Sequence, residues 1–235
     1  MPLKELSEAI HRGVGTPLKS ALDRLMSGLG LGPCPDEPNA TKSVAFTVAI
    51  VALSAKMAKA DGVVSQAEAD AFQAIFHTDA REMENVQRIF DLAKQDVSGF
   101  ESYAEQIAKL LHNEPQLMRD VFEGLFNIAA SDGILHENEE TYLETVAAIF
   151  GIAPAEYRAI RAQFVDDPDD AYTVLGLKRS NTNAEIRTQY RRLVRETHPD
   201  ALIARGVPKE FIDMADRKLA AINAAYEEIA RERGL

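Results

Sequence analysis

The sequence predicts an all-α protein in which a helical bundle is followed by a helical hairpin. Apolar residues recur at spacings of three and four along most of the chain, and no run of strict apolar–polar alternation between turn residues indicates a strand. The 235 residues are enough for two ordinary domains, and 46% hydrophobic with 27% charged residues is typical of a globular protein.

Breaks in the helical pattern divide the chain into four parts. Residues 1–41 form an amphipathic segment that runs into a Gly/Pro-rich linker, and residues 42–164 contain about seven helices separated by turn residues. An acidic linker at 165–169 leads into a second domain at 170–235. The aspartates at the end of this linker can cap the first helix of that domain.

The stretch VAFTVAIVALSAKMA, residues 44–58, is apolar on almost every side. A bilayer span needs about 20 such residues, and this run is shorter and holds Lys56, so we expect a buried central helix.

The first 30 residues show no continuous apolar run followed by a small-residue cleavage site, so no secretory signal is expected. Cys34 is the only cysteine, which excludes an intrachain disulfide and fits a reducing compartment. We therefore expect a cytoplasmic protein.

Charge is unevenly distributed over a chain whose net charge is -11. Residues 170–235 hold 12 Lys and Arg against 10 Asp and Glu, which leaves 14 against 27 for the remainder. An acidic surface repels phosphate backbones, so we expect no nucleic-acid partner. The basic hairpin is the local exception, but its connecting loop is much longer than that of a helix-turn-helix. No HExxH, P-loop or GxSxG motif is present, so we expect no enzymatic activity of the chain itself.

An internal repeat with a constant offset lies in the larger domain, as AKADGVVSQAE at 58–68 and AASDGILHENE at 129–139. Each copy contributes an aspartate and a glutamate to a candidate metal site: Asp61, Glu68, Asp132 and Glu139. Their spacing matches the second half of a calcium-binding EF-hand loop, but the oxygen ligands of the first half are absent. In the other interpretation these residues are structural, because Glu68 and Glu139 each lie where a capping box would start the next helix.

Residues 42–150 resemble the TerB-like helical domain, named after a tellurite-resistance family, through the two repeated segments. The resemblance implies a compact helical fold, and paired acidic residues at such turns have been proposed to bind metal in that family. We therefore expect no cofactor, unless a divalent metal binds at these acidic turns.

Two long amphipathic helices are predicted in the last part of the chain, at 183–195 and 211–233, and their apolar faces match. They should pack as an antiparallel hairpin joined by an irregular loop. The expected core of this hairpin consists of Ile186, Tyr190, Leu193, Leu219, Ile222 and Tyr226. A separate stripe of the first helix carries Arg187, Arg191 and Arg195, with Arg192 beside it.

The connecting loop opens with His198, Pro199 and Asp200. Proline fixes its own φ and favours extended geometry for the residue before it. We therefore expect the imidazole and the carboxylate to be held outward on a rigid corner beside the arginines, as a recognition surface. In the alternative interpretation the proline only ends the preceding helix.

Four motifs occur in order across 170–235: Tyr-x-x-Leu-Gly-Leu, Ile-Arg-x-x-Tyr-Arg-Arg-Leu, His-Pro-Asp and Ile-Asn-x-Ala-Tyr-Glu. Together they resemble the J-domain of the DnaJ co-chaperone family, and the TerB-like domain ahead of them resembles the DjlA-like group of that family. The resemblance implies a DnaK-type chaperone as partner, with its ATP hydrolysis stimulated by this chain. By the same resemblance, His198, Pro199 and Asp200 trigger hydrolysis, and the four arginines steer docking.

Two departures from the J-domain pattern are Thr197 in place of an aromatic residue and Ala201 in place of a lysine. No Gly/Phe-rich region or zinc-binding module follows, so the TerB-like domain is expected to supply localisation and client or partner specificity. In the alternative function, that domain is a metal- or stress-sensing module that regulates the J-domain. The DjlA-like group typically carries a membrane anchor, which we do not find. Peripheral association with the inner membrane through residues 2–28 is therefore the alternative to a purely cytoplasmic protein.

Overall fold

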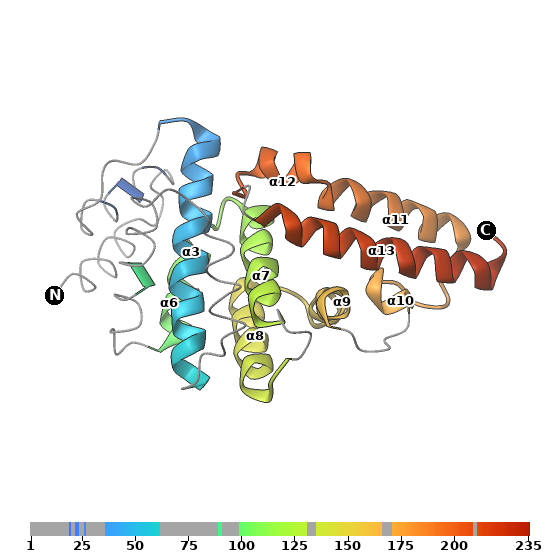
Figure 1. The fold of residues 1–235 in the computed structure, drawn as a ribbon, viewed down its shortest axis with the longest axis horizontal. Helices are drawn as coiled ribbons and strands as arrows, with labels where there is room; N and C mark the ends of the chain where they lie inside the picture. The colour runs from blue at the N-terminus through green and yellow to red at the C-terminus, as the bar shows by residue number, and fades with distance from the viewer. Residues whose placement is uncertain are drawn as a thin grey trace.

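The computed structural model describes residues 36–61, 99–130, 135–165, 171–208 and 211–235, with the isolated positions 19, 22, 23, 26, 89 and 90. All regular structure in these ranges is helical, which confirms the all-α fold class. The helices are α3 (Pro38–Asp61), α6 (Phe100–Leu110), α7 (Pro115–Ala129), α8 (Glu137–Phe150), α9 (Pro154–Phe164), α10 (Ala171–Val174), α11 (Asn183–Thr197), α12 (Pro199–Arg205) and α13 (Ile212–Arg233). Helices α3, α7 and α8 stand side by side, and the α11–α13 hairpin extends away from them (Figure 1).

Helix ends in the larger domain lie where turn residues predicted them. Helix α3 ends at Asp61, α6 follows Gly99, and α7 and α9 each begin with a proline. Proline suits the first position of a helix because its missing N–H has no partner there anyway. Turn residues in the sequence also predict helix breaks near 77–79 and 132–133, and both places lie outside the described residues.

Helix α3 is the expected central helix. Phe46, Ile50 and Leu53 have no exposed surface, and α3 packs against α6, α7 and α8. By length and composition Pro38–Met57 could cross a membrane, but 72% of this stretch is buried inside the protein. Full burial of a side chain of this kind stabilises a fold by about 1.5–3 kcal/mol. Burial of its apolar surface therefore explains why so apolar a helix belongs to the core.

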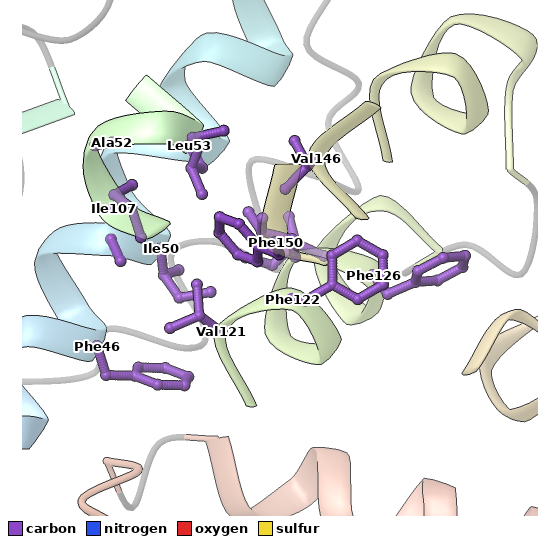
Figure 2. Packing of buried hydrophobic residues seen from close by; sticks show 14 of the residues in the cluster. Phe46, Ile50, Ala52, Leu53, Ile107, Val121, Phe122, Phe126, Val146 and Phe150 are labelled. Atoms are coloured by element: carbon purple, nitrogen blue, oxygen red, sulfur yellow. The ribbon is translucent and has the colours of Figure 1, made fainter. Parts of the chain in front are cut away.

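The larger hydrophobic core lies among α3, α6, α7 and α8, whose apolar side chains converge in Figure 2. The rings of Phe122 and Phe126 meet edge to face, with centroids 5.9 Å apart, and Tyr157 of α9 adds a ring 5.8 Å from Phe126. Such aromatic pairs stabilise by about 0.5–1.5 kcal/mol beyond the area that they bury. The aromatic contacts therefore attach α9 to this bundle.

A smaller core joins α10, α11 and α13. Ile186, Leu193 and Ile222 are buried there, and the rings of Tyr190 and Tyr226 stack with centroids 4.0 Å apart. These five of the six predicted core residues pack as expected.

The sixth predicted core residue, Leu219, is only partly buried and lies in neither hydrophobic cluster. The prediction failed because the buried face of α13 includes Lys218, which a hydrophobic pattern assigns to solvent. The amino-terminal half of α13 therefore turns a different face inward from the one expected.

The irregular loop predicted between the two long helices is wrong, because it contains the seven-residue helix α12. Pro199 occupies its first turn together with Asp200, whose charge suits the positive end of a helix. Gly206 ends it with φ 91°, a left-handed conformation that favours glycine. A helix this short has too few apolar residues to show a period.

Four residues from the predicted second domain belong to the larger core: Leu202, Val207, Phe211 and Ala215. The ring of Phe211 meets that of Phe46 edge to face, with centroids 4.7 Å apart. Gly124 of α7 permits this contact, since a methyl group there would lie 2.8 Å from Ile50 and 3.4 Å from both rings. The hairpin is thus packed on the bundle rather than tethered to it.

Candidate functional site

The His-Pro-Asp corner, His198 to Asp200, is the amino-terminal start of α12. His198 has extended backbone angles, φ -57° and ψ 136°, and its Nδ1 accepts a hydrogen bond of 3.2 Å from the Asp200 N–H. The imidazole therefore caps the helix, which leaves Nε2 directed away from that bond. The side chains of His198 and Asp200 are 54% and 89% exposed. The corner thus presents a fixed imidazole and a carboxylate to solvent.

Four arginines of α11 lie next to this corner, and we call them the arginine row: Arg187, Arg191, Arg192 and Arg195. All four are exposed. Arg192 donates to Gln189 Oε1 at 3.1 Å and lies 4.0 Å from the Glu196 carboxylate. Among the described carboxylates, none forms an ion pair with Arg187, Arg191 or Arg195. The row can therefore pair with an acidic partner at little cost in lost contacts.

The start of α11 is fixed by a capping box. Glu185 accepts from the Thr182 backbone N–H at 2.7 Å, and Thr182 Oγ1 accepts from the Glu185 N–H at 3.3 Å. The backbone and side-chain hydrogen bonds from Thr182 lower the pKa of Glu185. A box of this kind satisfies two of the otherwise unpaired N–H groups at a helix start. The rotation of α11, and hence the direction of the arginine row, is set from this end.

The opposite face of α11 is held against its neighbours. Gln189 donates to the Leu175 carbonyl at 2.8 Å, and the Tyr190 hydroxyl donates to Asn223 of α13 at 3.0 Å. These bonds, together with the stacking of Tyr190 on Tyr226, leave the arginine face outward.

Two family models match the chain in sequence order. The model described as tellurite resistance protein TerB matches residues 47–162, and the model described as DnaJ domain matches residues 170–233. These matches confirm the TerB-like and J-domain resemblances noted above. No solved structure matches the chain.

Several relatives share both parts. Co-chaperone protein DjlA of Coxiella burnetii is 31% identical over 201 residues, which cover 76% of this chain and 74% of that protein. The chain belongs to the DjlA co-chaperone family. Family members similar to it include co-chaperone protein DjlA of Photobacterium profundum, 29% identical over 80% of this chain and 78% of that protein. Co-chaperone protein DjlA of Escherichia coli K12 is 29% identical over 63% of this chain and 64% of its own length.

Of the four metal candidates of the TerB domain, Glu139 has a described side chain. Glu139 is buried, and its carboxylate accepts from the His136 N–H at 2.9 Å as part of a capping box at the start of α8. The side chains of Asp61, Glu68 and Asp132 lie outside the described residues. Within the described ranges, no three His, Cys, Asp or Glu side chains are arranged to hold a metal ion. The capping interpretation is observed for Glu139, and the metal site stays a prediction.

A cleft between α8 and α9 was not predicted. Its volume is about 550 Å³, and its lining includes Glu140 and Glu144 from α8 and Arg158 and Arg161 from α9. Arg161 donates to Glu140 at 2.9 Å. Burial, with the nearby Glu140 and Glu144 carboxylates, raises the pKa of Tyr157 in its wall. No local sequence pattern predicts this cleft, because its walls come from two separate helices.

A buried ionic cluster between the TerB domain and the J-domain was also missed. Asp120 and Glu123 of α7 are buried, as is Lys218 of α13. Lys218 Nζ lies 2.5 Å from Glu123, and Arg119 pairs with the same carboxylate at 3.2 Å. Burial alone would raise the pKa of Glu123, but Lys218 and Arg119 outweigh it and hold that pKa below its ordinary value.

Arg205 of α12 completes this cluster. Its Nε and Nη2 donate to the two oxygens of Asp120 at 2.7 and 2.9 Å. Burial raises the pKa of Asp120, and the bonds from Arg205 oppose that rise. The domains are therefore joined by paired charges as well as by apolar contacts.

Proposed function

We propose that this protein is a co-chaperone whose J-domain binds a DnaK-type chaperone and stimulates its ATP hydrolysis. The observation that carries the proposal is the exposed His-Pro-Asp corner beside the open arginine row on a rigid hairpin. The DnaJ domain match and the relatives named co-chaperone protein DjlA support it.

The arginine row acts first in this scheme. A row of exposed guanidinium groups accelerates encounter with an acidic surface and makes the association rate dependent on salt. The row runs along α11 from Arg187 to Arg195, so the attraction favours an acidic strip of the partner aligned with this helix. Docking in that orientation brings the corner to the chaperone.

The corner acts second. Because Pro199 and the cap made by His198 already fix its shape, little conformational entropy is lost when it contacts the chaperone. The ATP chemistry belongs to the partner, and this chain is an activator rather than an enzyme.

Single-turnover ATP hydrolysis by a cognate DnaK tests the proposal. The full-length protein should accelerate hydrolysis, and His198→Gln should return the rate to that of DnaK alone. His112→Gln is a matched control, because His112 is also exposed and bonds the backbone nearby, at Lys109 O. The proposal fails if the wild type leaves hydrolysis unchanged or if His198→Gln behaves like the wild type.

We further propose that the TerB domain supplies client or partner specificity through the cleft between α8 and α9. Its lining combines acidic groups from α8 and basic groups from α9 with apolar side chains such as Ala147 and Ile152, which suits a peptide carrying both charges. A photo-reactive side chain at exposed Ala148 should cross-link a defined partner, and Arg158→Glu should abolish that product. The same product from a probe at exposed Ala184 of the J-domain would exclude the cleft.

The proposed location is the cytoplasm, with peripheral association with the inner membrane as the alternative. Burial of α3 within the fold supports the first. Fractionation of cells that produce the full chain tests this location. Recovery in the soluble fraction supports the cytoplasm. Recovery in the membrane fraction, with release of the protein by a salt wash, supports the alternative.

A further inference from the structure

A single guanidinium connects the TerB domain to the residues that lead into the His-Pro-Asp corner. Besides its two bonds to Asp120, Arg205 Nη2 donates to the Glu196 carbonyl at 3.0 Å. Glu196 lies in the last turn of α11, just before His198. That carbonyl has no partner within its own helix, since the four last carbonyls of a helix never do.

The corner is anchored on both of its sides by this arrangement. On one side, Thr197 is buried and Glu196 is bonded through its backbone; on the other, Leu202 is part of the larger core. Movement of α12 against the TerB domain would therefore shift the corner as well. His198 and Asp200 point away from these contacts into solvent, so the anchoring leaves them accessible.

The far end of α12 is fixed by a separate contact. At Gly206 a methyl group would collide with Lys42 Cβ of α3 and lie 3.2 Å from the Asn39 carbonyl oxygen. The helix end therefore touches α3 with no space for a side chain. Held by α7 through Arg205 and by α3 at Gly206, α12 is anchored at its carboxyl end to two helices of the TerB domain.

We propose that Asp120 of the TerB domain is a positioning residue for the His-Pro-Asp corner: through Arg205 it fixes the end of α11 and the helix α12 in the orientation that activates the chaperone. The TerB domain thereby completes the activating surface of the J-domain. This inference rests on the proposed function and names a part of the same site.

Stability alone is a poor explanation for this ion pair. Removing two charges from water costs several kcal/mol per ion, and apolar residues of similar size often stabilise a core as well or better. A bidentate guanidinium–carboxylate pair fixes the distance and the angle between the two groups. Such fixed geometry is needed if the His-Pro-Asp corner must contact the chaperone at one position.

The experiment measures single-turnover ATP hydrolysis by DnaK at increasing concentrations of full-length Asp120→Ala and Arg205→Ala. The maximal acceleration should fall about tenfold in both, because a displaced contact group costs rate rather than encounter. The half-saturating concentration should change by less than about twofold, since the arginine row that governs docking is intact.

Arg217→Ala is a matched control at the same boundary between the two domains. Arg217 of α13 donates to Asn127 Oδ1 of α7, so it also joins the J-domain to α7, but this bond reaches neither α11 nor α12. This variant should retain the wild-type maximal acceleration.

Arg205→Lys separates positioning from folding. It keeps the charge but cannot reach both Asp120 oxygens and the Glu196 carbonyl together, so the maximal acceleration should fall about threefold in a folded protein. Acceleration within about twofold of wild type in Arg205→Ala, or an unchanged maximum in Arg205→Lys if Arg205→Ala does not fold, overturns the inference. If the wild type itself fails to accelerate hydrolysis, the proposed function fails instead.

Discussion

Two sets of cationic side chains on one helical hairpin have opposite environments. The arginine row of α11 is exposed, and three of its members have no ion pair among the described residues. Arg205 and Lys218, by contrast, are bonded to buried carboxylates of another domain. The difference teaches that position, and not residue type, decides whether a cation is available to a partner or fixed within the fold.

The largest expected effect is on stability, from Lys218→Ala. This change removes the 2.5 Å partner of the buried Glu123 but leaves Arg119 paired with it at 3.2 Å, so the loss should lie near the lower end of the about 3–5 kcal/mol that a broken buried pair costs. Arg191→Ala, at an exposed position of the row, should change the free energy of unfolding by less than about 0.5 kcal/mol. Urea unfolding of both variants makes the measurement. Equal losses of unfolding free energy in the two variants would show that the buried and the exposed cations contribute equally to stability.

The next effect is on association, from the triple variant Arg187→Ala, Arg191→Ala and Arg195→Ala. Binding to DnaK at low salt should slow about tenfold, because electrostatic attraction raises the association rate, and the difference should shrink as salt rises. Stopped-flow binding at several ionic strengths measures it, with unfolding in urea as the control for stability. A loss that is the same at every salt concentration would contradict the steering role.

A smaller effect depends on pH. The pKa of Glu123 in the folded protein lies below its ordinary value of 4.5, so its charge stabilises the fold above that pH, and the contribution is lost as the pH falls through the folded value. Glu123→Gln should therefore be less stable than wild type at neutral pH, and the gap should narrow below pH 4.5. Urea unfolding over this pH range measures the gap. A gap that stays constant or widens in acid would reverse the sign assigned to Glu123.

The smallest effect expected is at Thr182, where the capping box starts α11. Thr182→Ala should cost about 1 kcal/mol of unfolding free energy, as is typical for loss of such a cap. Thr188→Ala is a suitable comparison, because Thr188 is also exposed on α11 but bonds only the Ala184 carbonyl within the helix. If both changes cost the same, the capping box does not stabilise the start of α11.

The exposed set could be predicted from sequence, and the buried set could not. The arginine row follows from a spacing of three and four within one helix, and the corner follows from three adjacent residues. Arg205 and Lys218, however, find their partners 85 and 95 residues away, where no local pattern carries information. The same lack of long-range information explains the wrong prediction for Leu219. Its expected burial failed because Lys218 occupies the inward face of α13.

The short helix α12 was missed for a different reason. Pro199 and Gly206 suit the first turn and the end of a helix, but seven residues give fewer than two full periods of apolar spacing, so the sequence analysis assigned them to a loop. The central helix α3, with its long apolar run, gave the opposite case and was predicted correctly.

Leu202, Val207 and Phe211 fill space in the bundle core although they come after the corner in the chain. Separation of the two parts would leave these side chains in water and open a void in the bundle, so neither part can melt without exposing apolar surface of the other. Calorimetry of the intact protein should accordingly record one cooperative heat-absorption peak, and chain cleavage within 166–170 should leave the two fragments associated.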